Sequence, residues 1–476
     1  TRTHEAGFGY EVVERPVEGL TPENAKKPTP KVLAALEKAI ASLESAGAKG
    51  IAGESHLMWP LQEHAASEAK VPVYMSAMLQ IALLVPAHHT DQKFVIVTKD
   101  VEALEKSLKA VLEKHGIVFS PGRFIVTGLL DGEAESPQKL ADRLKAMESQ
   151  NGRIAGAIFD TGDLIEHADK VRAVTKYPIF DQVTLLDYFV SACSDNPFFG
   201  TSYRSGDSPD ALYTKAMRRL LSPSEAYLRD MKSKIDRHIK IGVLRLDYSY
   251  PPIPGDVACE ASYGYQVVFF TVEGLTFEKA QAATLDDKIK AGFERGVAAL
   301  EEQGVAAITG DCGFMMSYQT YVRALAKVPV ILSSIVQAPL IAASHKPDAE
   351  FAILTANSST FKTELLLTQS GVKVQPKNWI LVGLQDVPGF EAVALGQLVP
   401  AEKVQPSIEA MCKDLQAKHP KLKGFLLECT ELPHYADAIR AKTGLPVWDA
   451  ITMVDYFQNA CSADPQLTQK ALEAAL

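Results

Sequence analysis

The sequence lacks the features of several protein classes. Its longest apolar runs, such as SAMLQIALLVPA at 76–87, are shorter than the roughly 20 residues that a membrane-spanning helix needs. Basic residues are not in excess: the formal net charge of −9 argues against a protein that binds nucleic acid or an anionic membrane surface. No signal peptide follows Thr1, and no CxxC or paired-histidine pattern suggests a metal site. We expect a soluble protein that acts on a small molecule, without a metal.

Cysteine is scarce and shows no paired spacing. The six cysteines are Cys193, Cys259, Cys312, Cys412, Cys429 and Cys461. Dilute cysteines of this kind indicate reduced thiols in an intracellular enzyme more than a disulfide framework. The sequence does not distinguish a plastid protein from a cytoplasmic one.

The chain contains an internal repeat. EAGFGYEVVERPVEGLTPENA at 5–25 matches EASYGYQVVFFTVEGLTFEKA at 260–280. Between 164–193 and 432–461, 14 of 30 aligned positions are identical, where average residue usage would give about two. The sequence therefore predicts two homologous halves, packed on each other as the subunits of a homodimer would be.

The repeat divides the chain into three parts. We expect a first copy at 1–193, an extension and linker at 194–240, and a second copy at 241–476. The second copy opens with the strand-like IGVLRLDY at 241–248, which has no counterpart in the first copy. We expect either that the natural chain begins before Thr1 or that the first copy lacks its opening strand.

Short apolar runs alternate with helical patterns in the second copy. The strand-like runs are VAAIT at 305–309, VPVILSS at 328–334, FAILTA at 351–356, WILVGL at 379–384 and GFLLE at 424–428. Helical periodicity appears at 285–304, 407–419 and 432–444. This alternation is typical of an α/β protein with parallel sheets. We predict two doubly wound lobes in each copy, with a ligand at the carboxyl ends of the strands.

Two of the six cysteines follow predicted strands directly. Cys312 comes after VAAIT and Cys429 comes after GFLLE, each where a helix begins. A helix N-terminus lowers the pKa of a thiol and favours a bound carboxylate. We expect Cys312 and Cys429 to face each other across a cleft as a proton-transfer pair. The other four cysteines are interpreted as small buried hydrophobes.

The same stretches resemble a known family. ITGDCGFMMSYQ at 308–319 and LLECTELPHYADAIRAKTGLPVWDAIT at 426–452 resemble the two cysteine motifs of the aspartate/glutamate racemase superfamily. Together with GVLRLDYSYPPIPGD at 242–256 and VGLQDVPGFEAVA at 382–394, they are most similar to the Alma-type algal dimethylsulfoniopropionate lyases. The resemblance covers nearly all of 241–462.

The resemblance implies a β-elimination without a cofactor. Dimethylsulfoniopropionate would give dimethyl sulfide, acrylate and a proton, with Cys429 removing the α-proton and Cys312 facing it as acid or positioning group. A racemase or isomerase of the same fold that uses both thiols, and a non-catalytic binding protein, are the alternatives.

Polar residues at the starts of helices and loops are the candidate substrate contacts. For the carboxylate they are Thr430, Asn357 and Ser358. Lining the cleft we expect Ser333, Ser334 and Gln337. Near the sulfonium we expect Asp247, Tyr248 and Asp311, by charge or cation–π contact.

The first copy has lost both thiols. Cys312 aligns with Ser55, and Cys429 aligns with Thr161. An aliphatic hydroxyl is a much weaker acid than a thiol, so neither residue could replace a thiolate base unaided. We therefore predict a single active site in the second copy and a degenerate first copy. Further assembly into a homo-oligomer stays open.

Overall fold

A computed structural model describes most of the chain. The described residues are 10–25, 27–54, 56–114, 122–130, 132–133, 136–175, 177–196, 199, 239–362 and 376–462. Ser55 and most of the predicted linker at 194–240 lie outside them, so the predicted Cys312–Ser55 correspondence is not addressed by the structure.

The second half contains two four-stranded parallel sheets. The first has the order β10-β9-β7-β8, with β7 at Lys240–Arg245, β8 at Gln266–Thr271, β9 at Val305–Gly310 and β10 at Val330–Ile331. The second has the order β12-β11-β13-β14, with β11 at Glu350–Thr355, β12 at Trp379–Gly383, β13 at Leu422–Leu427 and β14 at Val447–Trp448. These are the two predicted lobes.

The first half repeats this plan in reduced form. Its larger sheet has the order β4-β3-β5-β6, with β3 at Lys93–Thr98, β4 at Phe124–Gly128, β5 at Ile154–Phe159 and β6 at Ile179–Phe180. Even the register shift in β11, between Glu350 and Phe351, recurs in β3 between Lys93 and Phe94. Its smaller sheet has only two strands among the described residues, β1 at Ile51–Ala52 and β2 at Val73–Tyr74. The tandem α/β repeat is therefore confirmed.

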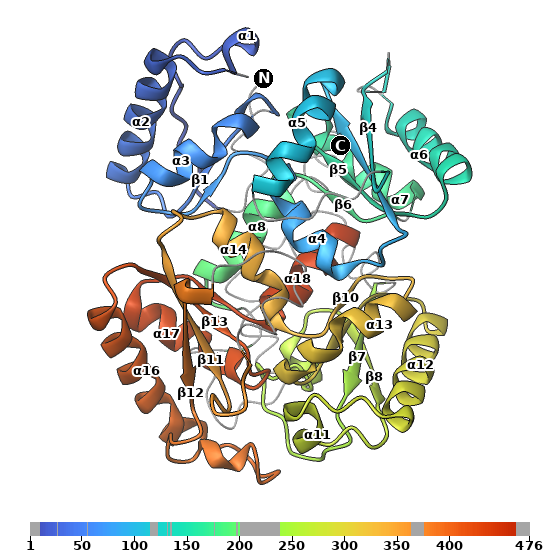
Figure 1. Cartoon of the computed structure of the whole chain (residues 1–476), viewed down its shortest axis with the longest axis vertical. Coiled ribbons are helices and arrows are strands. Elements are labelled where there is room, and N and C mark those ends of the chain that lie inside the picture. The colour runs from blue at the N-terminus through green and yellow to red at the C-terminus, as the bar shows by residue number, and fades with distance from the viewer. Residues whose placement is uncertain are drawn as a thin grey trace, which may run out of the picture.

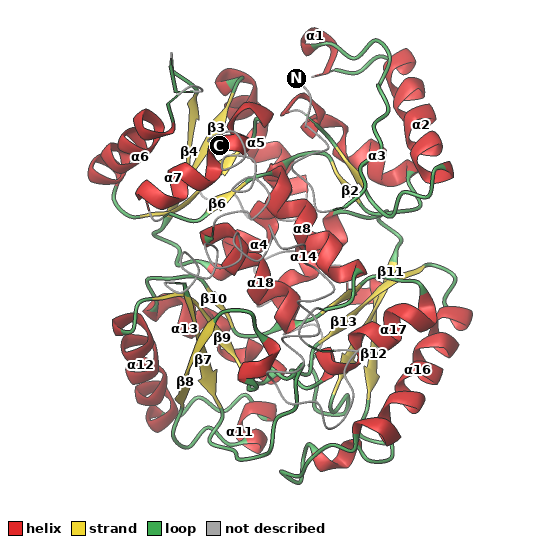
Figure 2. Ribbon diagram, turned by 180° about the vertical axis from the view of Figure 1, so that it is seen from behind, coloured by secondary structure: helices red, strands yellow, loops and turns green. Residues whose placement is uncertain are grey.

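Helices cover both faces of the sheets (Figure 2). In the first half they are α1 Pro22–Ala25, α2 Pro30–Ser45, α3 Gln62–Glu68, α4 Ile81–Ala87, α5 Val101–Lys114, α6 Pro137–Asn151, α7 Ala168–Thr175 and α8 Gln182–Cys193. In the second they are α11 Phe277–Gln281, α12 Asp287–Glu302, α13 Gln319–Leu325, α14 Ala338–Ala343, α16 Ala401–Lys418, α17 Ala436–Thr443 and α18 Ala450–Cys461. Corresponding helices start alike: the Asp181 carboxylate caps α8 through the N–H of Thr184, and Asp449 caps α18 through Thr452.

Short 3-10 helices precede several of these helices. They are η2 His56–Leu61, η3 Ala77–Gln80, η4 Gly162–His167, η5 Glu260–Ser262, η6 Gly313–Tyr318, η7 Ser334–Gln337, η8 Pro376–Asn378, η9 Phe390–Ala392 and η10 Leu432–Tyr435. The helix predicted at 432–444 is therefore η10 followed by α17.

The two halves pack through equivalent surfaces. Figure 1 shows α4 and α8 of the first half beside α14 and α18 of the second, in the middle of the molecule. The Tyr188 hydroxyl donates to Gln337 Oε1 at 2.9 Å, and the Tyr456 hydroxyl donates to Gln80 Oε1 at 2.8 Å. The largest cluster of buried apolar side chains draws from both halves. The interface is therefore a shared core with reciprocal hydrogen bonds.

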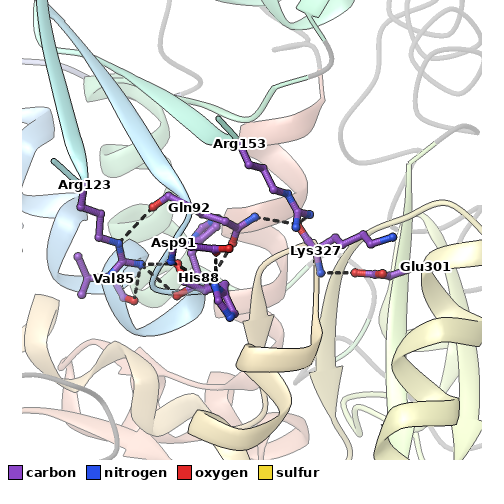
Figure 3. A network of polar contacts seen from close by, with 9 residues as sticks. Val85, His88, Asp91, Gln92, Arg123, Arg153, Glu301 and Lys327 are labelled. Atoms are coloured by element: carbon purple, nitrogen blue, oxygen red, sulfur yellow. Dashed lines mark hydrogen bonds and ion pairs between the residues drawn. The ribbon is translucent and has the colours of Figure 1, made fainter. Parts of the chain in front are cut away.

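A polar network joins the halves at the edge of this core (Figure 3). The carbonyl oxygen of Lys327 accepts hydrogen bonds from Gln92 Nε2, at 2.9 Å, and from the guanidinium of Arg153. The Arg123 guanidinium donates to the carbonyl oxygen of His88 at 3.0 Å and holds the loop that carries Gln92. Side chains of the first half thus bind main-chain oxygens of the second.

No helix within the described ranges is long and apolar enough to cross a membrane.

Candidate active site

The pocket that contains both predicted thiols lies between the two lobes of the second half. It has a volume of about 390 Å³, part of which is open to solvent. Its lining follows the carboxyl ends of β7, β9, β11 and β13 and consists of Leu246, Tyr248, Tyr250, Phe277, Asp311, Cys312, Gly313, Phe314, Ala356, Val393, Glu428, Cys429, Thr430 and Glu431. This is where ligands bind in open parallel sheets.

The two thiols reach the pocket from equivalent places in different lobes. Cys312 lies two residues after β9, in extended conformation at the start of η6. Cys429 lies two residues after β13, just before η10. Both are buried, with 6% and 7% exposure. The Thr430 hydroxyl donates to the Asp311 carbonyl oxygen at 2.5 Å, which ties the two turns together.

The pKa of each thiol is raised, which corrects the expectation that a helix start would lower it. Burial raises the pKa of Cys312 well above its usual value of 9.0, and Glu428 and Asp311 add to the shift. Burial also raises the pKa of Cys429, with Glu431 and Glu428 adding to it. The N–H groups of Phe314 and Glu431 do favour the thiolates. Desolvation and neighbouring carboxylates outweigh these backbone dipoles.

Buried carboxyl groups surround the thiols. Burial raises the pKa values of Asp256, Asp311 and Glu428 to about 7 each, and that of Glu431 well above 4.5. No Lys, Arg or His is among the described residues that line the pocket. The pocket is therefore rich in proton-binding oxygen and poor in positive charge.

Aromatic rings form the other wall. Tyr248 stacks on Phe277 at 5.9 Å between centroids, and Phe277 meets Phe314 edge-on at 6.2 Å. The Tyr248 hydroxyl donates to the Val393 carbonyl oxygen at 2.8 Å. A second pocket of about 260 Å³ shares Tyr250 and Glu431 with the first. An aromatic and carboxylate lining suits a cation with apolar substituents.

Five of the predicted site residues line the pocket together. They are Cys312, Cys429, Thr430, Asp311 and Tyr248.

The other six predicted site residues do not line the pocket. Their polar groups contact other residues of the chain instead. Asp247 is exposed and accepts the Gly274 N–H at 2.8 Å. Asn357 Oδ1 accepts the Ser359 N–H, and the Ser358 N–H donates to Gln385 Oε1.

Ser333, Ser334 and Gln337 belong to the turn at η7. Ser333 caps that turn, and the Ser334 hydroxyl donates to the Leu427 carbonyl oxygen at 2.7 Å. Gln337 takes part in the contact between the halves.

Sequence reasoning did not single out Glu428, Tyr250, Phe277 or Phe314. A signal for Glu428 was present, because a carboxyl residue directly precedes each thiol, in DC at 311–312 and in EC at 428–429. No comparable signal marks the aromatic residues, since the pocket assembles them from separate segments. No three His, Cys, Asp or Glu side chains of the described residues gather as a metal site would require.

The fold and the pocket define a class: a two-lobed α/β enzyme with paired thiols between its lobes. The chain is 32% identical over 461 residues to dimethylsulfoniopropionate lyase 5 of Emiliania huxleyi. The aligned region covers 90% of this chain and 89% of the relative. It therefore belongs to the dimethylsulfoniopropionate lyase family, and the resemblance drawn from the sequence is confirmed.

Other relatives match mainly half of the chain. Lyase 6 of Emiliania huxleyi is 43% identical over 229 residues, 47% of this chain and 60% of that protein. The lyase of Durusdinium sp. clade D is 41% identical over 224 residues, 46% of this chain and 74% of that protein.

Solved structures also match about half of the chain. The aspartate racemase of Picrophilus torridus is 14% identical, covering 47% of this chain and 95% of its own, with a TM-score of 0.32. An arylmalonate decarboxylase is 17% identical, covering 46% and 92%, with a TM-score of 0.33. No family model matches the sequence.

Proposed function

We propose that the chain cleaves dimethylsulfoniopropionate to dimethyl sulfide and acrylate without a cofactor. The observation that carries this proposal is the pair of buried thiols, Cys312 and Cys429, in one carboxylate-rich and aromatic pocket of a dimethylsulfoniopropionate lyase family member. The pocket fits a small substrate that is cationic at one end.

Cys429 is proposed as the base. Its thiolate removes the proton on the carbon next to the substrate carboxylate, and the electron pair of that C–H bond becomes the C=C bond of acrylate. The C–S bond breaks in a second step, after reversible removal of the proton, and its electron pair leaves on sulfur as neutral dimethyl sulfide. Cys429 holds the proton as a thiol until solvent takes it up. An elimination needs only one base, so Cys312 is assigned to positioning or to proton donation.

Substrate binding helps to form this thiolate. Because burial and carboxylates raise the thiol pKa values, Cys429 is mainly neutral in the empty pocket at neutral pH. A bound sulfonium brings a positive charge close to the thiol, which favours the thiolate. The substrate therefore supplies the charge that the lining residues lack.

The substrate carboxylate is proposed to lie near Thr430 and the end of β11. Ala356 lines the pocket directly before Asn357 and Ser358. Asn357 and Ser358 are therefore proposed as further contacts of the substrate carboxylate.

The first half is proposed to be a degenerate partner in an intramolecular pseudo-dimer. We propose the boundaries 1–193, 194–240 and 241–476 for the degenerate copy, the linker and the catalytic copy. The reciprocal tyrosine–glutamine hydrogen bonds support such a relation. Thr161 stands at the Cys429 position and offers no thiol there.

Symmetric thiols also suit a racemase, which is the second candidate. In a racemase each thiol serves one face of the substrate, so both thiols would be needed for racemisation. In the elimination proposed here only Cys429 would be.

The decisive measurement is release of dimethyl sulfide into headspace from dimethylsulfoniopropionate. We expect the intact chain to release it and Cys429→Ala to lower the rate roughly 10²- to 10⁴-fold, the usual contribution of a general base. Cys412→Ala is the matched control, because Cys412 is buried in α16 away from the pocket. Absence of dimethyl sulfide together with racemisation of aspartate or glutamate would select the second candidate.

Exchange of the α-proton with solvent deuterium separates the two thiols. We expect Cys429→Ser to lose exchange and Cys312→Ser to retain part of it. Exchange that survives in Cys429→Ser would contradict the assignment of Cys429 as the base.

A further inference from the structure

The carboxyl groups before the two thiols have different surroundings. Asp311 Oδ1 accepts the Leu246 N–H at 2.9 Å, and Asp311 Oδ2 lies 3.5 Å from Arg245 Nε. Glu428 is fully buried, and neither of its carboxyl oxygens accepts a hydrogen bond from any residue that the structure describes. The Thr355 hydroxyl interacts with the Glu428 carboxyl group and lowers its pKa, but the contact does not meet the geometry of a full hydrogen bond. Of the two carboxyl groups, Asp311 and Glu428, only that of Glu428 lacks a full hydrogen bond from the described residues.

In the first half, the carboxyl group at the equivalent position has a hydrogen-bond partner. Asp160 aligns with Glu428, at the end of the equivalent strand. The Ser76 hydroxyl donates to Asp160 Oδ1 at 2.6 Å. The hydroxyl of Ser333, the counterpart of Ser76, accepts the Ile335 N–H and does not bind Glu428. Where the thiols are absent, the protein satisfies this carboxyl group itself.

The Glu428 side chain crosses from its own lobe to the turn of the opposite thiol. A Cβ atom on Gly313 would lie 2.2 Å from Glu428 Oε1, so only glycine leaves room for this carboxyl group beside Cys312. Glu428 also raises the pKa values of both Cys312 and Cys429. The carboxyl group therefore lies in the pocket, near both thiols.

An unpaired buried carboxylate destabilises a folded protein unless a ligand compensates it. A bound cation would compensate the carboxylate, and the rings of Phe314 and Phe277 in the same pocket favour a cation with apolar substituents. A metal ion is a poor fit, because the described residues do not gather a ligand set.

We propose that Glu428 binds the cationic onium centre of the substrate and sets the specificity of this pocket for onium carboxylates. This inference rests on the proposed function for the identity of the onium group as a sulfonium. Glu431, whose Oε2 also lacks a partner, forms the boundary with the second pocket and supports the same charge.

The contact acts on substrate binding more than on the chemical step. The sulfonium keeps its positive charge while the α-proton is removed, so Glu428 stabilises the bound substrate and the transition state for proton removal about equally. Loss of the carboxylate should raise KM while leaving kcat nearly unchanged. A purely structural role would lower kcat or the amount of folded enzyme instead.

The test compares Glu428→Gln with the unaltered full-length chain. The probes are two inhibitors of equal chain length, 3-(trimethylammonio)propionate and 3-(methylthio)propionate, which share the carboxylate and differ in that the thioether end carries no positive charge. We expect the unaltered chain to bind the cation at least tenfold more tightly and Glu428→Gln to lose that preference. We also expect KM for dimethylsulfoniopropionate to rise roughly ten- to a hundredfold, the loss typical of a buried charged contact, with kcat within about threefold.

Matched variants guard against a folding defect. Glu402→Gln changes an exposed glutamate at the start of α16 and should keep the preference for the cation. Glu428→Asp keeps the charge and should keep part of the preference. If Glu428→Gln does not fold, the preference for the cationic inhibitor is compared between the unaltered chain and Glu428→Asp, and this comparison still tests the inference.

Three outcomes would overturn the inference: equal binding of both inhibitors by the unaltered chain, an unchanged preference in folded Glu428→Gln, or a loss of kcat at constant KM. Inhibitor binding measured by calorimetry does not require turnover. A chain that prefers the cation but releases no dimethyl sulfide would refute the proposed function and leave this inference standing.

Discussion

Asp160 and Glu428 show how one position serves two purposes. Both carboxyl groups are buried at the end of equivalent strands, and burial raises both pKa values to about 7. Asp160 has the Ser76 hydroxyl as a partner, whereas Glu428 faces the pocket. A buried carboxyl group with a raised pKa binds its proton more tightly in the folded state than in the unfolded state. The free energy of unfolding therefore falls as the pH rises above the pKa of the unfolded state.

Asp160→Asn should therefore change the pH dependence of stability. The folded carboxyl group ionises near pH 7 and the unfolded one near 3.8. Relative to the unaltered chain, the variant should gain stability as the pH rises from about 4 to about 7, by up to about 4 kcal/mol, and no further above that range. Urea unfolding at pH 5 and pH 8 measures the difference. Asp386→Asn, at an exposed site, is the control; an equal effect of Asp160→Asn at both pH values would contradict the prediction.

At the scale of elements, α8 and α18 hold the halves together. The rings of Tyr188 on α8 and Tyr456 on α18 have centroids 5.5 Å apart. Each hydroxyl donates a hydrogen bond to a glutamine of the opposite half. Each Gln side chain also donates to the main chain, as Gln337 does to the carbonyl oxygen of Asp449. The interface thus fixes the turns η3 and η7, and η7 contacts β13 through the Ser334 hydroxyl. Packing between the halves therefore supports the strand that carries Cys429.

Tyr188→Phe and Tyr456→Phe should cost similar amounts of stability. Each removes one hydroxyl and leaves a buried glutamine oxygen unpaired, at a cost of about 1–3 kcal/mol. Chemical denaturation of the two single variants checks this expectation. Tyr321→Phe is the control, because its hydroxyl binds Glu294 at an exposed position and should cost less than about 0.5 kcal/mol. Markedly different costs for the two interface variants would argue against equivalent roles for the halves.

At the scale of the whole molecule, the largest apolar core is shared by the two halves, beside smaller clusters that each belong to one half. The main apolar cluster includes Phe180 and Phe189 of the first half with Phe457 and Ile341 of the second. Separation would expose these side chains to water, at about 25 cal/mol for each Å² of apolar surface. A half of this chain is therefore a poor candidate for an independent monomer.

Expression of residues 239–462 alone tests this conclusion. We expect the isolated second half to self-associate or aggregate, because α14 and α18 lose the surface of α4 and α8. Light scattering after size-exclusion chromatography, with the full chain in the same buffer as reference, gives the mass. A monomeric and fully active second half would contradict the expectation.

The sequence by itself determined the repeat, the alternation of strands and helices, and the position of Cys312 and Cys429 at strand ends. These features depend on local periodicity and on identities between aligned segments, which a single chain displays directly. It also showed Thr161 in place of a thiol. The membership of the lyase family followed from the same motifs and is confirmed.

Only the tertiary structure decided the character of the pocket. The sign of the thiol pKa shift depends on burial and on carboxyl groups brought in from β9 and β13, which the backbone dipole at one turn does not reveal. The aromatic wall joins residues after β7 to residues in α11 and η6, far apart along the chain. Whether a buried group such as Glu428 has a partner depends on every segment packed around it, and this is a property of the folded chain alone.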